Sequence, residues 1–258
     1  MKRFFEYLGL SAIILFSFYY TEKVVFLSQS KNTLIIAIKE AAIKEDVKAV
    51  NAEILGNNIV PGVNGEKVNI QKSYYKMKNF GIFNHYYLVF DEIKPDISVE
   101  KNKEKIIIKG HKSKNSVSLV IDNNEAVKKF MEEQKIPSTI ITYLDSYKNT
   151  LLEQINGESD KTKFNNLESI LNKNKKNVHL CLKNNSNKEI CLKNNNYLVK
   201  ESLYLSSINF VQMKSQIESG VVILIKEGAK VEDVNLLLRQ IAYQGLKITY
   251  LSELLSEK

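Results

Sequence analysis

The pattern of apolar and polar positions divides the chain into two unlike parts. Residues 7–20 are uncharged and mostly apolar, and they follow a basic pair, Lys2 and Arg3, and two phenylalanines. With those phenylalanines the run approaches the roughly 17 residues that are the lower limit for a membrane-spanning helix. Farther along, apolar residues recur at helix and strand spacings among many charged ones. The pattern predicts a membrane anchor with its flank in residues 1–30 and folded structure after it.

The anchor has two rival interpretations. A secretory signal peptide would also be short with a basic start, but Phe18 to Thr21 offer no small-x-small cleavage site. A buried core helix would be unusual beside two N-terminal basic residues. Those basic residues place the N-terminus in the cytoplasm. We therefore expect a single-pass protein of the cell membrane whose main domain is extracytoplasmic.

Residues 31–112 predict a stalk helix followed by a small α+β module. The stalk helix begins after Asn32, a favourable N-cap. A Val-Pro-Gly-Val-Asn-Gly sequence at residues 60–65 predicts turns, and a later amphipathic helix ends at Gly81. Strands are expected at residues 51–55, 85–93 and 105–109.

A strand, a helix and a second strand open the next region. Ser116–Ile121 is a short apolar strand that stops at Asp122. Residues Glu125–Gln134 have the spacing of an amphipathic helix, and Ile136–Thr142 form the second strand. Strand, helix and strand in this order make a right-handed βαβ unit, which predicts a parallel sheet or barrel.

This order resembles the opening of the polysaccharide deacetylase (NodB-homology) family, in which a Thr-Phe-Asp-Asp-Gly strand end precedes a helix and an Ala-Thr-Phe-Phe strand. Here Val120-Ile-Asp-Asn-Asn124 and Ser138-Thr-Ile-Ile141 occupy those places. The C-terminal region is also similar to the family's last strands and helices, at residues 217–225, 231–245 and 247–255. The resemblance implies an α/β fold, a distorted (β/α) barrel over residues 113–258, with any site at the carboxyl ends of the strands.

The resemblance also assigns roles to particular positions. In the family a first Asp is the base, a second Asp and a His-x-x-x-His pair hold a divalent metal, and a late His is the acid. Asp122 matches the base, but Asn123 replaces the metal-binding Asp, Lys163 and Leu167 stand at the two His positions, and Lys226 stands at the late His. Because these side chains cannot replace imidazole ligands, we expect no metal cofactor unless an unfamiliar activity requires zinc or another divalent ion. Asp122 is then a vestigial base, or only the N-cap of the following helix.

The remaining candidates for chemistry are few. The three histidines, His85, His111 and His179, have no metal-ligand spacing, and none lies between residues 112 and 178. Serines occur in no nucleophile-elbow pattern. Cys181 and Cys191 lie in two alternating segments around an Asn-rich turn, which predicts a hairpin with a disulfide across it or two buried free thiols.

Charge narrows the function only slightly. The chain has 37 Lys and Arg against 29 Asp and Glu, but the excess is Lys dispersed among Asn, which argues against nucleic acid. We expect a non-catalytic deacetylase-like protein that binds cell-wall glycan or an envelope protein. The alternatives are a divergent hydrolase acting on N-acetylated glycans through Asp122 and a purely structural scaffold.

Overall fold

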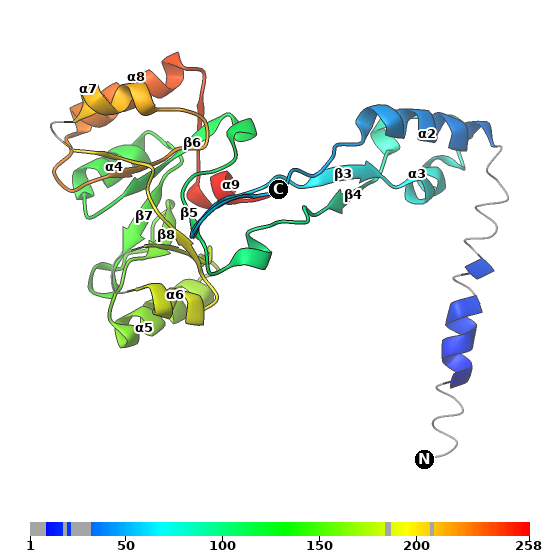
Figure 1. The fold of residues 1–258 in the computed structure, drawn as a ribbon, viewed down its shortest axis with the longest axis horizontal. Coiled ribbons are helices and arrows are strands. Elements are labelled where there is room, and N and C mark those ends of the chain that lie inside the picture. Colours follow the sequence, from blue (N-terminus) through cyan, green and yellow to red (C-terminus); the bar gives the residue numbers. More distant parts are fainter. Residues whose placement is uncertain (1–8, 18–19, 22–31, 184–186, 207–208) are drawn as a thin grey trace. The chain divides into compact units, whose positions relative to one another are not determined.

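The computed structural model describes residues 9–17, 20–21, 32–183, 187–206 and 209–258 (Figure 1). The chain forms two compact units. Unit 1 comprises Met1–Ala49 and Gly65–Ile93, and unit 2 comprises Val50–Asn64 and Lys94–Lys258. Over these described ranges no helix has the length and apolar character that a membrane crossing requires. The predicted span at residues 7–20 lies partly outside them, so the anchor stays a prediction.

Unit 1 is built from two helices and a two-stranded sheet. Helix α2 (Thr33–Glu45) begins after Asn32, whose side chain accepts the N–H of Leu34, as predicted. Strand β3 (Gly65–Val68) pairs antiparallel with β4 (Phe90–Ile93). Helix α3 (Ile70–Met77) ends with Lys78 as its C-cap, three residues before the expected cap Gly81, which has the left-handed backbone. The unit has its own core of Leu34, Ile35, Ile38, Ala42, Val68, Tyr74, Met77 and Leu88. The strand expected at residues 85–93 is shorter, because a 3-10 turn occupies His85–Tyr87.

The predicted βαβ unit opens the parallel sheet of unit 2. Strand β6 (Ser116–Ile121) leads through α4 (Glu125–Glu133) to β7 (Thr139–Thr142), and the two strands pair in parallel. The other helices are α5 (Lys161–Lys173), α6 (Lys188–Lys193), α7 (Phe210–Met213), α8 (Val231–Tyr243) and α9 (Leu251–Leu255). Short 3-10 turns occur at Glu100–Asn102, Lys112–Lys114, Leu144–Ser146 and Lys214–Gln216.

The strands of unit 2 form two sheets. The first has the order β11-β12-β6-β7-β8, with β13 also beside β6, and the second has the order β1-β2-β5-β10-β9. Every strand pair of this unit except β1 with β2 is parallel, and an isolated parallel bridge joins Gln154 of β8 to Asn177, which precedes β9. Their bounds are β1 (Glu53–Leu55), β2 (Asn58–Val60), β5 (Ile106–Ile107), β8 (Glu153–Asn156), β9 (Leu180–Leu182), β10 (Tyr197–Val199), β11 (Leu203–Leu205), β12 (Val222–Ile225) and β13 (Lys247–Thr249). The predicted α/β fold with a parallel, barrel-like strand arrangement is confirmed.

Strand β6 is buried along its whole length because both of its faces are covered. Alternate residues of β6 point to opposite faces of the sheet and pack in two different hydrophobic cores. Val117, Leu119 and Ile121 contribute to the core that includes apolar residues of α4 and α8. Val120 contributes to the core that includes β2, β5, β10 and α9. In Figure 1, α4, α7 and α8 lie at one side of this unit, and α5 and α6 lie at the other.

Two expectations differ from the observed fold. The stalk helix and the small module were expected together over residues 31–112, but β5 pairs with both β2 and β10, so residues 50–64 and 94–112 belong to unit 2. The hairpin predicted around the cysteines is wrong, because Lys188–Lys193 is helix α6. Strand β9 instead pairs in parallel with β10, and a parallel pair needs a crossover connection in place of a tight turn.

Candidate functional site

Asp122 lies at the carboxyl end of β6, where a barrel of this kind places its chemistry. Its backbone N–H donates to the carbonyl of Ile225 on β12, at 3.0 Å, which holds the residue at the strand end. Its half-buried carboxylate accepts a hydrogen bond from the hydroxyl of Tyr143, at 3.3 Å. Tyr143 follows β7, so two neighbouring parallel strands bring the pair together.

Tyr143 is held in its protonated form. Burial is the main cause that raises its pKa to about 12, and the charge and hydrogen bond of Asp122 add to it, followed by the charge of Glu158. A phenol with this pKa donates a hydrogen bond and does not act as a base near neutral pH. Asp122 is therefore paired with a neutral donor, and Tyr143 is a site residue that the strand-end position after β7 could have indicated from the sequence.

The two asparagines after Asp122 have different roles. Asn123 is exposed and has a left-handed backbone, with φ of 44°. Asn124 is buried, and its Oδ1 accepts the N–H of Val127, so Asn124 caps α4. The alternative that Asp122 is this cap is wrong, because the helix begins two residues later than such a cap would require.

Asn124 also joins two loops. Its Nδ2 group donates to the backbone carbonyls of Lys226, Glu227 and Ala229, at 3.2, 3.0 and 2.9 Å. The amide thus fastens the end of β6 to the turn between β12 and α8. An aspartate could cap the helix but could not donate to these carbonyls.

The expected metal-ligand positions on α5 are occupied by unsuitable side chains. Lys163 donates to Asp145, an ion pair whose hydrogen bond raises the pKa of the lysine. Leu167 is fully buried. At the late position, Lys226 is exposed, and its Nζ lies 4.3 Å from the ring centre of Tyr204. A lysine ammonium repels a metal ion, and leucine has no ligand atom.

Nearby carboxylates already have structural hydrogen-bond partners. Glu158 is buried and accepts the N–H of Leu144 at 2.7 Å. Glu168 is also buried, and it accepts hydrogen bonds from the side-chain amides of Asn156, Asn177 and Asn196. Across the residues that the structure describes, no three His, Cys, Asp or Glu side chains gather where they could hold a metal ion. The residues at this site do not fit the metal of a deacetylase.

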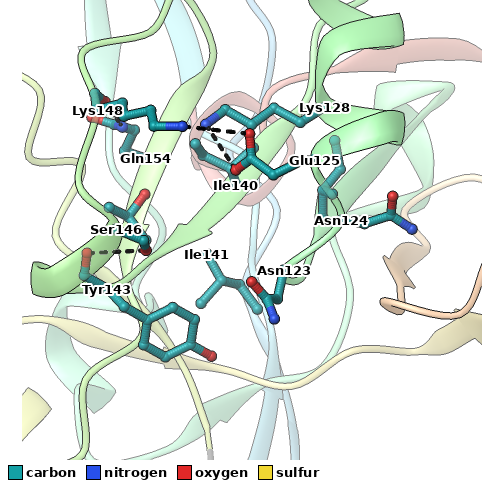
Figure 2. Close-up of a pocket in the computed structure, with 12 residues that line it drawn as sticks. Asn123, Asn124, Glu125, Lys128, Ile140, Ile141, Tyr143, Ser146, Lys148 and Gln154 are labelled. Atoms are coloured by element: carbon teal, nitrogen blue, oxygen red, sulfur yellow. Dashed lines mark hydrogen bonds and ion pairs between the residues drawn. The ribbon is translucent and has the colours of Figure 1, made fainter.

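A small pocket lies beside Asn123, between the start of α4 and the segment after β7 (Figure 2). At its rim Glu125 is ion-paired with Lys128 and Lys148, at 3.7 and 4.0 Å. The pocket has room for one or two water molecules, about 30 Å³, whereas ligand pockets begin near roughly 300 Å³. Buried oxygens of Thr142 and Gln154 on its wall lack protein partners, which suits a water and not a sugar ring.

The cysteines and histidines have partners of their own. Cys181 and Cys191 are buried and joined by a disulfide, with their Cα atoms 6.3 Å apart. His85 lies 3.8 Å from Glu45. The other histidines are His111, whose pKa is lowered first by burial and then by nearby lysines, and His179, which contacts Asn196.

No family model matches the chain. The uncharacterized protein YlxY of Bacillus subtilis (strain 168) is 34% identical over 113 residues, which are 42% of this chain and 35% of that protein. The match thus spans about a third of the relative's length. Among solved structures, BA3943, a CE4 family pseudoenzyme from Bacillus anthracis, has a TM-score of 0.60 at 20% identity, covering 87% of this chain and 95% of that one.

The chain has the CE4 deacetylase fold. A BA3943 mutant, described as a pseudoenzyme with restored enzymatic activity, gives the same TM-score and identity and is covered over 98% of its length. The predicted polysaccharide deacetylase resemblance is therefore confirmed at the level of fold. At 20% identity the likeness shows the fold alone.

Proposed function

We propose that this chain is a catalytically inactive protein with the CE4 fold that acts in the cell envelope by binding glycan or a partner protein. The observation that carries the proposal is Leu167, because a fully buried leucine stands where the fold's metal chemistry needs an imidazole. The Lys163–Asp145 ion pair at the other position supports the same conclusion. The pseudoenzyme status of BA3943 adds support from a similar fold.

Acetate release tests the absence of catalysis. Purified protein should release no acetate from chitooligosaccharide or peptidoglycan above the rate of an Asp122→Asn control, with zinc added or withheld. Asn123→Asp alone should remain inactive, since both imidazoles are still missing. Stoichiometric zinc together with acetate release that depends on Asp122 would contradict the proposal and favour a divergent hydrolase.

The exposed pair of Tyr204 and Lys226 supports binding of a glycan. The Tyr204 ring is partly exposed, and the Lys226 ammonium lies over it, so an aromatic face and a cationic donor are offered together. Wild-type protein should sediment with insoluble peptidoglycan. The fraction of Tyr204→Ala that sediments should be several-fold lower. Tyr243→Ala, at another exposed tyrosine, is the matched control. Equal retention of both variants would leave a protein partner or a scaffold as the better function.

An envelope location is supported by the predicted anchor and by the buried disulfide, since oxidising compartments preserve disulfides. Carbonate washing of membranes should leave the protein in the pellet, and protease added to intact spheroplasts should digest it. A soluble chain that begins after Thr21 would replace the anchor with a cleaved signal peptide.

A further inference from the structure

An aromatic segment of unit 1 has no role in the site described above. Residues 74–90 contain seven of the chain's 13 Tyr and 11 Phe in 17 positions, although aromatics make up only 9% of the sequence. The same positions include Lys76 and Lys78 but no Asp or Glu. The segment is therefore both aromatic and basic.

Only part of this segment is needed for the core of unit 1. Tyr74, Met77 and Leu88 are buried, but residues 78–87, named here the aromatic loop, are exposed throughout. Its most exposed large side chains are Tyr86 at 91%, Ile82 at 70% and Phe80 at 61%. Clustered exposed apolar side chains of this kind mark an interaction surface.

The aromatic loop has a defined conformation. The rings of Phe80 and Tyr87 stack, with centroids 5.6 Å apart and planes 3° from parallel. Gly81 supplies the left-handed backbone after α3, with φ of 70°, and Asn84 accepts the N–H of Tyr86. Because the loop is pre-organised, little further ordering is needed when it binds.

We propose that the aromatic loop docks on the anionic surface of the lipid bilayer. Tyrosine is favoured at the headgroup level, and apolar side chains such as Ile82 and Phe80 gain by entering the acyl boundary. Lys76 and Lys78 supply the charge that anionic headgroups attract, and residues 74–90 themselves include no Asp or Glu. The acidic side chain beside the loop is Glu45, which lies 3.8 Å from His85. A glycan site would favour flat aromatic rings beside free polar groups over a protruding isoleucine. In the aromatic loop the side chain of Asn84 already accepts the N–H of Tyr86.

The inference rests on the proposed membrane attachment. Only ten residues separate Thr21 from Asn32, and a chain of ten residues spans at most about 36 Å. An anchor ending near Thr21 would therefore keep unit 1 close to the bilayer. At the high local concentration that such a tether creates, even a weak surface contact is populated. Docking of the aromatic loop would fix how unit 1 is presented to the envelope.

The absence of tryptophan from the chain makes a direct test possible. Full-length Tyr86→Trp would be reconstituted in phosphatidylcholine and phosphatidylglycerol vesicles with brominated acyl chains, which quench an inserted indole. Tyr243→Trp is the matched reporter, since Tyr243 is 87% exposed and lies on α8 of unit 2. We expect the emission of Tyr86→Trp to fall by roughly half or more, as for a side chain at the acyl boundary, and that of Tyr243→Trp to remain unchanged.

A second pair of substitutions tests the loop itself. Ile82→Asp in the Tyr86→Trp background should abolish the quenching. The quenching of Tyr86→Trp without this second substitution should be weaker in vesicles that lack phosphatidylglycerol. Val211→Asp is the control, because Val211 is 72% exposed on α7. Neither site lies in a core, so both variants should fold.

Flotation of the vesicles separates this inference from the attachment on which it rests. Protein that floats with the vesicles but shows no quenching at position 86 would overturn the docking and leave the anchor intact. Protein that does not float and is not quenched would overturn both. Equal quenching of the two reporters, or an emission change with soluble peptidoglycan fragments in place of vesicles, would also overturn the proposal.

Discussion

The carboxyl end of β6 and helix α5 hold the two sets of positions that the family resemblance assigns to a metal site, and their side chains depart from such a site in different ways. After β6, Asp122 keeps its carboxylate and Asn123 is exposed. On α5, Lys163 forms a surface ion pair and Leu167 is fully buried. The first region has changed its functional groups while keeping polar surroundings, whereas the second has become part of the packing.

This difference indicates how far each region stands from a working metal site. An aspartate at position 123 would be exposed to solvent and would change the free energy of unfolding little. An imidazole at position 167 would enter a space shaped for leucine, where an unpaired polar group is costly. A metal site with a histidine at position 167 would therefore require rebuilding the interior on the α5 side.

The largest effect is expected at Leu167. Leu167→His should lower the free energy of unfolding by about 2 to 4 kcal/mol, because a polar ring replaces a fully buried apolar side chain. Urea denaturation followed by circular dichroism measures this. Leu167→Met, which conserves volume, should cost less than about 1.5 kcal/mol. A Leu167→His protein as stable as wild type would show that this part of α5 can still accommodate a ligand.

The same substitution at two adjacent residues tests the β6 side. Asn124→Asp should lower the free energy of unfolding by roughly 2 kcal/mol, because a carboxylate would face three carbonyls that now accept hydrogen bonds. Asn123→Asp, at an exposed residue, should leave stability unchanged. Chemical denaturation of both variants decides it, and equal stabilities would mean that the Asn124 bridge contributes nothing.

The Asp122–Tyr143 pair predicts a titration. Absorbance is measured at alkaline pH for wild type and for Tyr143→Phe. The difference between them should show one phenol with a pKa of about 12, above the ordinary tyrosine pKa of about 10. Since the folded pKa is raised, its contribution to stability is complete below pH 10 and is lost as pH rises toward 12. Asp122→Asn should lower this pKa only partly, because burial is the larger cause. A Tyr143 pKa near 10 in wild type would contradict both the burial of this phenol and its pairing with Asp122.

The smallest effect is expected at Lys163. Lys163→His should leave the urea midpoint unchanged, since the ion pair with Asp145 is solvent-exposed and screened. Titration with zinc should also give no binding, as no second imidazole is near. Tight zinc binding by this single variant would mean that carboxylates such as Glu158 can be recruited, and it would weaken the contrast between the two regions.

Strand and helix positions around the site were largely predictable. Residues 116–121 form β6 with the predicted bounds, because a short, mostly apolar and uncharged run that ends in polar residues is typical of a strand covered on both faces. The helix after it was predicted to within one residue at its end. The segment at Cys191 was not predictable, since its alternation suits a strand equally well. In the structure it is helix α6, which lies on the crossover that the parallel pairing of β9 with β10 requires.

The sequence by itself determined which functional groups this protein can use: no histidine lies between residues 112 and 178, and no rearrangement of the fold can supply one. It also determined the strand, helix and strand that open unit 2, because their apolar spacing is local. Only the tertiary structure decided that Leu167 is buried, that Asn124 binds three carbonyls of a distant turn, and that Tyr143 meets Asp122. These contacts join residues far apart in the chain, so they depend on how strands pair and helices pack, which local patterns do not specify.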